Sequence, residues 1–457
     1  MKRRTFSFLT GTMLAALKLG RAGAQSANNQ SLLTTTLTPM GSQRAGNADG
    51  SIPAWNGGYT TIPSGWQPGD YMPDFFVEEQ PSLVVDASNV QQHSERLSDG
   101  TIALINKYGF SLKIYPTHRT ASAPQWVYDN IAKNADRAEL NPAGGRFGFR
   151  NAYGGVPFPL PDVSDSLSAG AQIIWNHNAR WCGQAVSVTD NSYVVNNGSV
   201  VLASINEDKF VYPYYSSSGS LENFDGLQFK GSAFVAGPAN LVGTQALTYQ
   251  QTDGPTIAWE VLSGQGRVRK APEVAYDTPS SYTDGISNYD EYFGFTGSLD
   301  RYDWKYLGKK ELYIPYNNNG LYLLPAEQVH KAHFFDPNVV RWELHRVWVV
   351  EATLHPGQRN ILARRRFYVD EDTWTIALVD AWDAAGNLYK VNTCYNFLRP
   401  DLPGLVFGQN VVNNMQTDDY VSVGGPWNQR AQPTYNFYDS LPATEFDAEH
   451  MAAAAQY

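Results

Sequence analysis

Arg301-Tyr302-Asp303-Trp304-Lys305-Tyr306 is a stretch in which aromatic and charged side chains alternate strictly. Successive side chains of a β-strand point to opposite faces, so the aromatic residues share one face and the charged residues the other. A strand with one buried and one solvated face is typical of an antiparallel sheet. The stretch therefore predicts that this part of the chain is antiparallel sheet.

The same twofold alternation continues on both sides of this stretch, from about Val200 to near the end of the chain. Short acidic or glycine-containing connections at 370–372 and 383–387 predict a meander of three neighbouring strands. We expect eleven or twelve strands in total. The clearest are Leu227–Val235, Thr256–Leu262, Leu344–Leu354, Arg365–Asp370, Thr373–Trp382 and Leu388–Phe397.

Helical periodicity is confined to the first half of the chain. The candidates are Ala87–Tyr108, Ala123–Leu140 and Leu167–Trp181, preceded by an irregular arm over Leu37–Trp66 that is rich in turn residues. Many strands with few long helices predict a mainly β (α+β) fold. We expect one large, curved antiparallel sheet, a half-barrel, that wraps the helices on its concave face.

The first 24 residues have the pattern of a cleavable export signal. A basic head at Lys2, Arg3 and Arg4 precedes a short apolar run, and Ala22-Gly23-Ala24 offers a cleavage site. The adjacent arginines leave secretory and twin-arginine export both open. We expect a soluble periplasmic protein that is not a lipoprotein, with residues 25–160 as an irregular and helical region continuous with a β half-barrel over 161–457.

Composition indicates a folded, acidic protein, with 42% hydrophobic and 13% aromatic residues. Loss of residues 1–24 would leave 29 Lys and Arg against 44 Asp and Glu, a net charge of −15. Such a charge argues against a nucleic-acid partner. Cys182 and Cys394 are the two cysteines, and buried thiols are a simpler interpretation than a disulfide.

An apolar ligand needs a pocket of apolar and aromatic side chains with few polar anchors. Three groups on predicted strands share this chemistry, although packing in the core is the simpler interpretation of each single residue. The candidate ligand-binding residues are Leu227, Phe229, Ile257, Trp259, Val261, Tyr302, Trp304 and Tyr306.

Two further features of the chain are basic rather than apolar. Arg267 and Arg269 are two positions apart and would share a strand face, where they could hold a carboxylate or phosphate, or pair with acidic side chains in solvent. Arg364-Arg365-Arg366 could form a docking patch, but a solvated edge strand is the simpler interpretation.

Signatures of the common catalytic and cofactor sites are absent from the sequence, so we expect no cofactor and no metal. His330 with His333, and His345 with His355, lack a convincing third zinc ligand. Asp370-Glu371-Asp372 does not alternate its ligands as a calcium loop does, and we expect a solvated turn there.

Several motifs resemble a bacterial family known as domain of unknown function 1329. They are Thr38-Pro39-Met40-Gly41, Arg44-Ala45-Gly46-Asn47-Ala48-Asp49-Gly50, Ile52-Pro53-Ala54-Trp55, Tyr115-Pro116-Thr117-His118-Arg119, Ala123-Pro124-Gln125-Trp126-Val127-Tyr128, Tyr153-Gly154-Gly155-Val156-Pro157-Phe158-Pro159, Arg267-Val268-Arg269-Lys270-Ala271-Pro272, Tyr302-Asp303-Trp304 and Arg366 to Trp374. The resemblance implies a fold similar to the periplasmic lipoprotein carriers. It also implies work beside an exporter of the resistance-nodulation-division type and an outer-membrane protein, and it supplies no catalytic residues.

Two classes of function remain open from the sequence. One is a binding or carrier protein for a hydrophobic small molecule or lipid, which we favour over an enzyme. The other is a periplasmic hydrolase that acts on a glycan or lipid through two carboxylates, although 44 acidic residues do not single out a pair. A sugar-binding module that stacks on aromatic side chains is a third alternative.

Overall fold

A single large sheet dominates the computed structural model, which describes residues 29–265, 267–271, 276–425 and 435–454. Among these residues the sheet has 16 strands in the order β1-β2-β12-β13-β14-β15-β16-β17-β5-β6-β7-β8-β9-β10, with β11 paired to β12 and β18 paired to β5. Every pairing in it is antiparallel except that of β2 with β12. The expected export signal lies outside the described residues.

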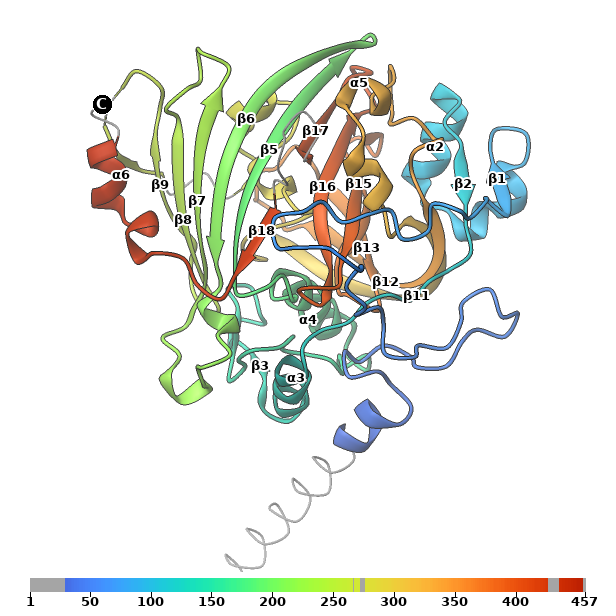
Figure 1. The fold of residues 1–457 in the computed structure, drawn as a ribbon, viewed down its shortest axis with the longest axis horizontal. Helices are drawn as coiled ribbons and strands as arrows, with labels where there is room; N and C mark the ends of the chain where they lie inside the picture. Colours follow the sequence, from blue (N-terminus) through green and yellow to red (C-terminus); the bar gives the residue numbers. More distant parts are fainter. Residues whose placement is uncertain (1–28, 266, 272–275, 426–434, 455–457) are drawn as a thin grey trace, which may run out of the picture.

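The strands of the sheet fall into two long runs, one at each side of the curved surface in Figure 1. The first run comprises β5 (Ala185–Asn196), β6 (Ser199–Val211), β7 (Leu227–Gly237), β8 (Gln245–Gln251), β9 (Ile257–Val261) and β10 (Arg269–Lys270). The second comprises β11 (Tyr302–Pro315), β12 (Trp342–Leu354), β13 (Arg364–Asp370), β14 (Ile376–Trp382), β15 (Leu388–Arg399), β16 (Gly404–Asn414) and β17 (Tyr420–Gly425). Short strands complete the set: β1 (Leu83–Val85), β2 (Leu112–Ile114) and β18 (Tyr435–Tyr438), while β3 (Glu139–Leu140) and β4 (Phe149–Arg150) form a separate pair.

The predicted antiparallel sheet is confirmed, and so is the strand predicted from the alternating residues 301–306. Tyr302 and Trp304 are buried in β11 while Asp303 and Lys305 are exposed. The three predicted strands of the meander are β13, β14 and β15, and each pairs with the next. The sheet nevertheless begins earlier than the expected Val200, because β5 starts at Ala185.

The helices lie on both faces of the sheet rather than only on the concave one. The predicted segments become a short 3-10 helix (Val90–Arg96) with α2 (Asp99–Tyr108), then α3 (Gln125–Arg137) and α4 (Ser166–Asn178). α4 packs against β11 and β12, whereas α2 packs against β14 and β15. Further along the chain are α5 (Ala326–Val329) and α6 (Ala448–Ala454).

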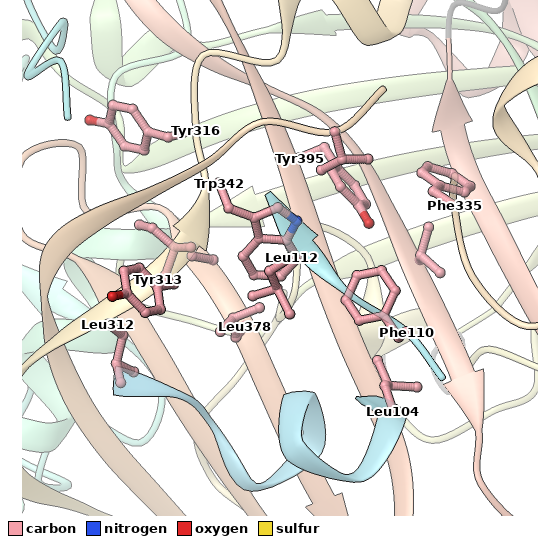
Figure 2. Packing of buried hydrophobic residues seen from close by; sticks show 14 of the residues in the cluster. Leu104, Phe110, Leu112, Leu312, Tyr313, Tyr316, Phe335, Trp342, Leu378 and Tyr395 are labelled. Atoms are coloured by element: carbon pink, nitrogen blue, oxygen red, sulfur yellow. The ribbon is translucent and has the colours of Figure 1, made fainter. Parts of the chain in front are cut away.

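Two hydrophobic cores account for this arrangement, because adjacent residues of one strand contribute to different cores. Leu378 and Val379 of β14 are neighbours in the chain; Leu378 packs with α2 and Val379 packs with α4. Figure 2 shows the α2 side, where Leu112 lies beside Trp342 and Leu104 lies beside Phe110. The central strands are therefore buried on both faces.

A third and smaller core lies on the outer face of β8 and β9. Leu247 and Val261 pack there with Phe446 and Met451 of the C-terminal segment, and Trp259 lies at the edge of the same cluster. Figure 1 shows α6 at this side of the molecule, beside β9. The C-terminal segment thus covers one face of the first run of strands.

The N-terminal arm is irregular and is tied to the sheet through Arg119. The Arg119 guanidinium donates to the backbone oxygens of Gln43 (2.8 Å) and Arg44 (3.1 Å). It also binds both carboxylate oxygens of Asp372, at 2.8 and 2.6 Å, in the turn between β13 and β14. A guanidinium that binds a carboxylate through two bonds is both strong and directional, so it fixes the path of the arm.

Candidate functional site: a cavity on the inner face of β5–β9

A cavity of about 240 Å³ lies between the inner face of the first run of strands and the segment 282–297. Its remaining walls come from β16, β17, β18 and the residues that follow α4. Among its lining residues are Arg180, Cys182, Val186, Val188, Asp190, Asn206, Asp208, Phe210, Tyr212, Phe229, Gly231, Ala233, Ala246, Thr248, Gln250, Ala258, Tyr282, Tyr289, Tyr292, Phe293, Phe407, Asn410 and Tyr435.

Small side chains on the strands make room for the cavity. Gly231, Ala233, Ala246, Thr248 and Ala258 all line it, and they lie on three consecutive strands, β7 to β9. The bulkier neighbours of Ala246 and Ala258 point to the opposite face because side chains alternate along a strand. The chain therefore places its small residues toward the cavity and its large ones toward the C-terminal segment.

The wall opposite the sheet is aromatic. Tyr282, Tyr289 and Tyr292 lie close together: the Tyr282 and Tyr289 rings are 6.2 Å apart at 87°, and the Tyr289 and Tyr292 rings 6.3 Å apart at 24°. Phe293 continues this wall and meets Phe407 edge-on at 5.0 Å. The cavity is thus bounded by π faces on one side and by small aliphatic groups on the other.

Two buried ion pairs hold this aromatic wall in place. Asp290 binds Arg365 of β13 at 2.7 Å, and Glu291 binds Lys390 of β15 at 2.6 Å. All four side chains are at most 5% exposed. A buried ion pair is strongly destabilising when one partner is removed, so the wall is fixed to the second run of strands. The expectation that Arg365 belongs to a solvated edge strand is wrong, because β12 and β14 flank β13.

The polar groups at one end of the cavity are mainly acceptors. Asp190 and Asp208 both line it, and Asp190 accepts a hydrogen bond from Nδ2 of Asn206 at 2.8 Å. Oδ1 of Asp208 and Oδ1 of Asn410 are buried and have no hydrogen-bond partner among the described residues. Burial, and then the charge of Asp190, raises the pKa of Asp208 well above its usual value.

The carboxylates lie near the tyrosines of the wall. Burial raises the pKa of Tyr292 and of Tyr435, and the negative charges of Asp190 and Asp208 raise both further. The effect of one charge on the pKa of another group falls with the distance between them. The acidic pair and the aromatic wall therefore form one end of the cavity.

Among the described residues that line the cavity, Arg180 is the basic one, and it lies beside Cys182 and Tyr212. Its charge lowers the pKa of both groups against the larger effect of burial. Its guanidinium lies 5.4 Å from the Phe293 ring centre and 6.0 Å from that of Phe407, and donates to the backbone oxygen of His177 at 2.8 Å. Within the described part of the chain it forms no ion pair with a carboxylate.

Of the ligand-binding residues predicted from sequence, Phe229 lines the cavity. Leu227, in the same strand, is buried but does not line it. Ile257, Trp259 and Val261 share the face of β9 opposite to Ala258, where the C-terminal segment packs.

The remaining predicted residues lie away from the cavity. Tyr302 and Trp304 belong to the core under α4, and their polar tips donate to the backbone oxygens of Leu362 (2.8 Å) and Leu299 (2.9 Å). Tyr306 is half-buried, with its ring 5.6 Å from that of Trp348. Arg267 and Arg269 are exposed, and Arg269 pairs with Glu260 at 2.7 Å.

A second cluster of titratable side chains lies at the turn between β13 and β14. His345, Asp370 and Asp372 place one potential metal-ligand atom each within 4.8 Å of one another, and all three residues are buried. The expected solvated turn is therefore wrong: Asp370, Glu371 and Asp372 are 2 to 4% exposed. His355 lies elsewhere, with Nδ1 3.3 Å from Asp303.

The partners of this second cluster come from distant parts of the chain. Arg119 occupies both oxygens of Asp372, Lys309 binds Glu371 at 2.7 Å, and Nε2 of His345 lies 3.1 Å from Glu343. Burial, and then the charge of Asp372, raises the pKa of Asp370 to about 6. Because a fixed guanidinium already neutralises Asp372, this cluster is better suited to holding the arm than to holding a cation.

Both cysteines are free thiols. Cys394 is buried in the core under α4, and Cys182 borders the cavity. Burial raises the pKa of each thiol, that of Cys394 strongly. A thiol with a raised pKa is unreactive, which agrees with two thiols that behave as small apolar residues.

A broad, open sheet with few helices, packed on both of its faces, places the chain among the mainly β folds. The chain belongs to the family described as "Protein of unknown function (DUF1329)", whose model matches residues 84–452. The predicted family is thereby confirmed. An uncharacterized protein of Pseudomonas aeruginosa is 37% identical over 401 residues, which cover 86% of each chain.

Solved structures with a similar fold were also found. A putative outer membrane lipoprotein-sorting protein domain from Vibrio parahaemolyticus and a DUF1329 family protein from Desulfovibrio piger each align with 63% of this chain and 99% of their own, at 14% identity and a TM-score of 0.43. A LolA superfamily protein from Nitrosomonas europaea aligns with 62% of this chain and 98% of its own, at 10% identity and a TM-score of 0.35. Among the described residues no helix is long and apolar enough to cross a membrane.

Proposed function

We propose that the protein is a periplasmic binding or carrier protein for a hydrophobic, lipid-like small molecule, which it holds in the cavity on the inner face of β5–β9. The observation that carries the proposal is a cavity of about 240 Å³ whose walls are small aliphatic groups on one side and aromatic rings on the other. Largely apolar cavities with a few convergent polar groups are the usual form of a small-molecule site.

The partners that we propose follow from the family resemblance. An inner-membrane exporter of the resistance-nodulation-division type would supply or receive the ligand, and an outer-membrane protein would act at the other end. The chain holds the ligand between them and needs no cofactor for that role.

Native mass spectrometry of the protein purified without detergent tests the binding role. We expect a species heavier than the polypeptide, and organic extraction should release a lipid, sterol or fatty amphiphile. A mass equal to that of the bare polypeptide, together with no uptake of alkyl probes, would contradict the proposal.

A cavity-filling variant ties binding to this cavity. In Ala258→Phe the added ring would project into the cavity, so we expect at least a tenfold loss of affinity for an alkyl probe such as dodecanol. Ile257→Phe is the matched control, because it introduces the same residue on the opposite face of β9. Equal effects of the two variants, or no effect of Ala258→Phe, would show that the probe binds elsewhere.

Asp190 and Asp208 also keep a second function open, namely a hydrolase that acts on a glycan or lipid through a carboxylate pair. Both acids line the same cavity. Burial raises the pKa of Asp208, as a general acid requires. The extraction experiment separates the two functions: a carrier releases an intact ligand, whereas a hydrolase converts added ester or glycoside substrates.

A further inference from the structure

We propose that Arg180 binds an anionic head group of the ligand, so that the protein carries an amphiphile with a carboxylate or phosphate at one end and an apolar body. This proposal rests on the proposed binding function and specifies the chemistry of its ligand. The observation behind it is a buried guanidinium that lines the cavity and forms no ion pair with a carboxylate of the described residues.

Arg180 differs from the other buried basic side chains in the described part of the chain. A buried charge is costly unless it is paired, and each of the others forms an ion pair with a carboxylate. These paired residues are Arg119, Arg341, Arg346, Arg365, Lys390 and Arg399. Arg180 is 8% exposed, and the counter-ion that it lacks among the described residues is the group that a ligand can supply.

The hydrogen bonds of Arg180 leave one edge of its guanidinium open. Nη1 donates to the backbone oxygen of His177 at 2.8 Å and lies 3.5 Å from Nε2 of the same residue, whereas Nε and Nη2 form no hydrogen bond with a described residue. In Arg119 the same two atoms bind the two carboxylate oxygens of Asp372, at 2.8 and 2.6 Å. The open edge of Arg180 therefore fits a head group that offers two oxygens, as a carboxylate or a phosphate does.

The titratable groups that feel the charge of Arg180 are themselves neutral near pH 7. Burial lowers the pKa of His177 well below its usual value, and the charge of Arg180 lowers it further. Burial raises the pKa of Cys182 and of Tyr212 by more than the charge of Arg180 lowers it. None of these three neighbours provides a negative charge, so a bound anion would be the counter-ion of Arg180.

The rings of Phe293 and Phe407 hold the guanidinium without neutralising it. They lie 5.4 and 6.0 Å from it, within the range of a cation–π attraction, but an aromatic ring carries no net charge. Apolar rings beside the guanidinium also keep the local dielectric low, which strengthens its attraction to an anion.

The acidic side chains of the cavity lie away from Arg180. Tyr212 follows the last residue of β6 beside Arg180, and Asp208 is four residues back along the strand, which is about 13 Å. Asp190 of β5 pairs two residues farther along β6 than Asp208 does. An anionic head at Arg180 would thus avoid the acids, and the apolar body would extend past the small residues of β7, β8 and β9.

Binding of four probes with the same alkyl chain tests the proposal: dodecanoic acid, dodecyl phosphate, dodecanol and dodecylamine. We expect the wild-type protein to bind at least one of the two anions about ten times more tightly than dodecanol, because a hydrogen bond to a charged group contributes more than a neutral one. Dodecylamine should bind more weakly than dodecanol. The tighter of the two anions identifies the head group. Calorimetry near neutral pH and at constant salt measures all four, since ionic strength screens charge.

Variants of Arg180 connect this preference to the guanidinium. Arg180→Gln should lose about tenfold or more in affinity for the anion and keep its affinity for dodecanol within about twofold. Arg180→Lys retains the charge but not the two-donor edge, so its affinity for the anion should fall between those of the wild type and Arg180→Gln. Arg359→Gln is the matched control, because Arg359 is exposed and does not line the cavity, and it should leave anion binding unchanged.

The outcomes separate the head-group proposal from the binding function. Dodecanol that binds as tightly as both anions, dodecylamine that binds more tightly than dodecanol, or an unchanged affinity for the anion in both Arg180 variants would each overturn the head-group proposal while leaving the binding function standing. If Arg180→Gln does not fold, the ranking of probes by the wild type and by Arg180→Lys decides. If no probe binds the wild-type protein, the binding function itself fails.

Discussion

The two runs of strands in the sheet differ in how their buried charged side chains are paired. In the second run, β11–β17, buried charged groups are paired: Arg119 with Asp372, Arg365 with Asp290, and Lys390 with Glu291. In the first run, β5–β9, Asp208 faces the cavity with a buried oxygen that has no hydrogen-bond partner among the described residues. The second run thus neutralises these buried charges in pairs, whereas the first run places a buried acid at the wall of a cavity.

The two runs also differ in how closely their faces are packed. β12–β16 are covered by hydrophobic cores on both faces, whereas β8 and β9 have a core on the outer face and a cavity on the inner one. Close-packed interiors tolerate little change of volume, while the wall of a cavity can accept extra atoms. The comparison therefore predicts different responses to mutation on the two sides.

The largest effect is expected in the second run, from Arg119→Ala. This change leaves the buried Asp372 carboxylate without its counter-ion and frees the N-terminal arm from its anchor. Breaking a buried ion pair costs about 3–5 kcal/mol, which urea unfolding followed by fluorescence would measure. A loss below about 1 kcal/mol would show that the second run is no more dependent on paired charges than the surface is.

An intermediate effect is expected in the first run, where Asp208→Asn should increase the stability of the protein rather than lower it. The pKa of Asp208 is higher in the folded protein than in the unfolded chain, so the stabilisation from its bound proton is complete below the ordinary value of 3.8 and is lost as the pH rises through the raised value. The asparagine variant avoids this loss. It should be more stable than the wild type at pH 7.

The pH dependence provides the internal control for this variant. The difference in unfolding free energy should shrink toward zero as the pH falls well below 3.8, where the wild-type carboxyl is protonated in both states. Urea unfolding at about pH 3, 5.5 and 7 would measure it. A variant that is less stable than the wild type at pH 7 would mean that the Asp208 carboxylate has a partner that satisfies it.

The smallest effect is expected from Arg269→Ala at the edge of the first run. Arg269 pairs with Glu260 at 2.7 Å, but its side chain is 53% exposed. Exposed ion pairs typically contribute about 0.2–1 kcal/mol, and salt screens them. Thermal unfolding at low and high salt would measure the change, and a loss as large as that of Arg119→Ala would contradict the comparison.

Much of the second run could be predicted from the sequence because its signals are local. The alternation of Tyr302 and Trp304 with charged residues, and the short turns of the meander, depend on neighbours in the chain. The burial of the turn at 370–372 could not be predicted in this way. Its counter-ions, Arg119 and Lys309, lie about 250 and 60 positions away in the sequence.

The cavity was harder to predict because the bulky apolar residues of β9, which the sequence suggested as ligand-binding residues, lie on the face opposite to the cavity. Trp259 and Val261 have the expected chemistry of a ligand pocket, yet they pack under the C-terminal segment. Ala258, which lies between Ile257 and Trp259 in the same strand, is the residue that lines the cavity. A run of small residues on one face of adjacent strands was the signal that could have located it, since space is left where side chains are short.

The 3-10 helix Tyr289–Glu291 combines two kinds of residue on one turn of chain, and this affects how the protein can be adapted. Asp290 and Glu291 fasten the turn to β13 and β15, while Tyr289 faces the cavity. Substitution of Tyr289 would therefore alter the wall of the proposed ligand site while leaving the two ion pairs in place. The same scaffold could be re-engineered as a sensor or a scavenger for other small molecules by exchanging tyrosines and alanines alone.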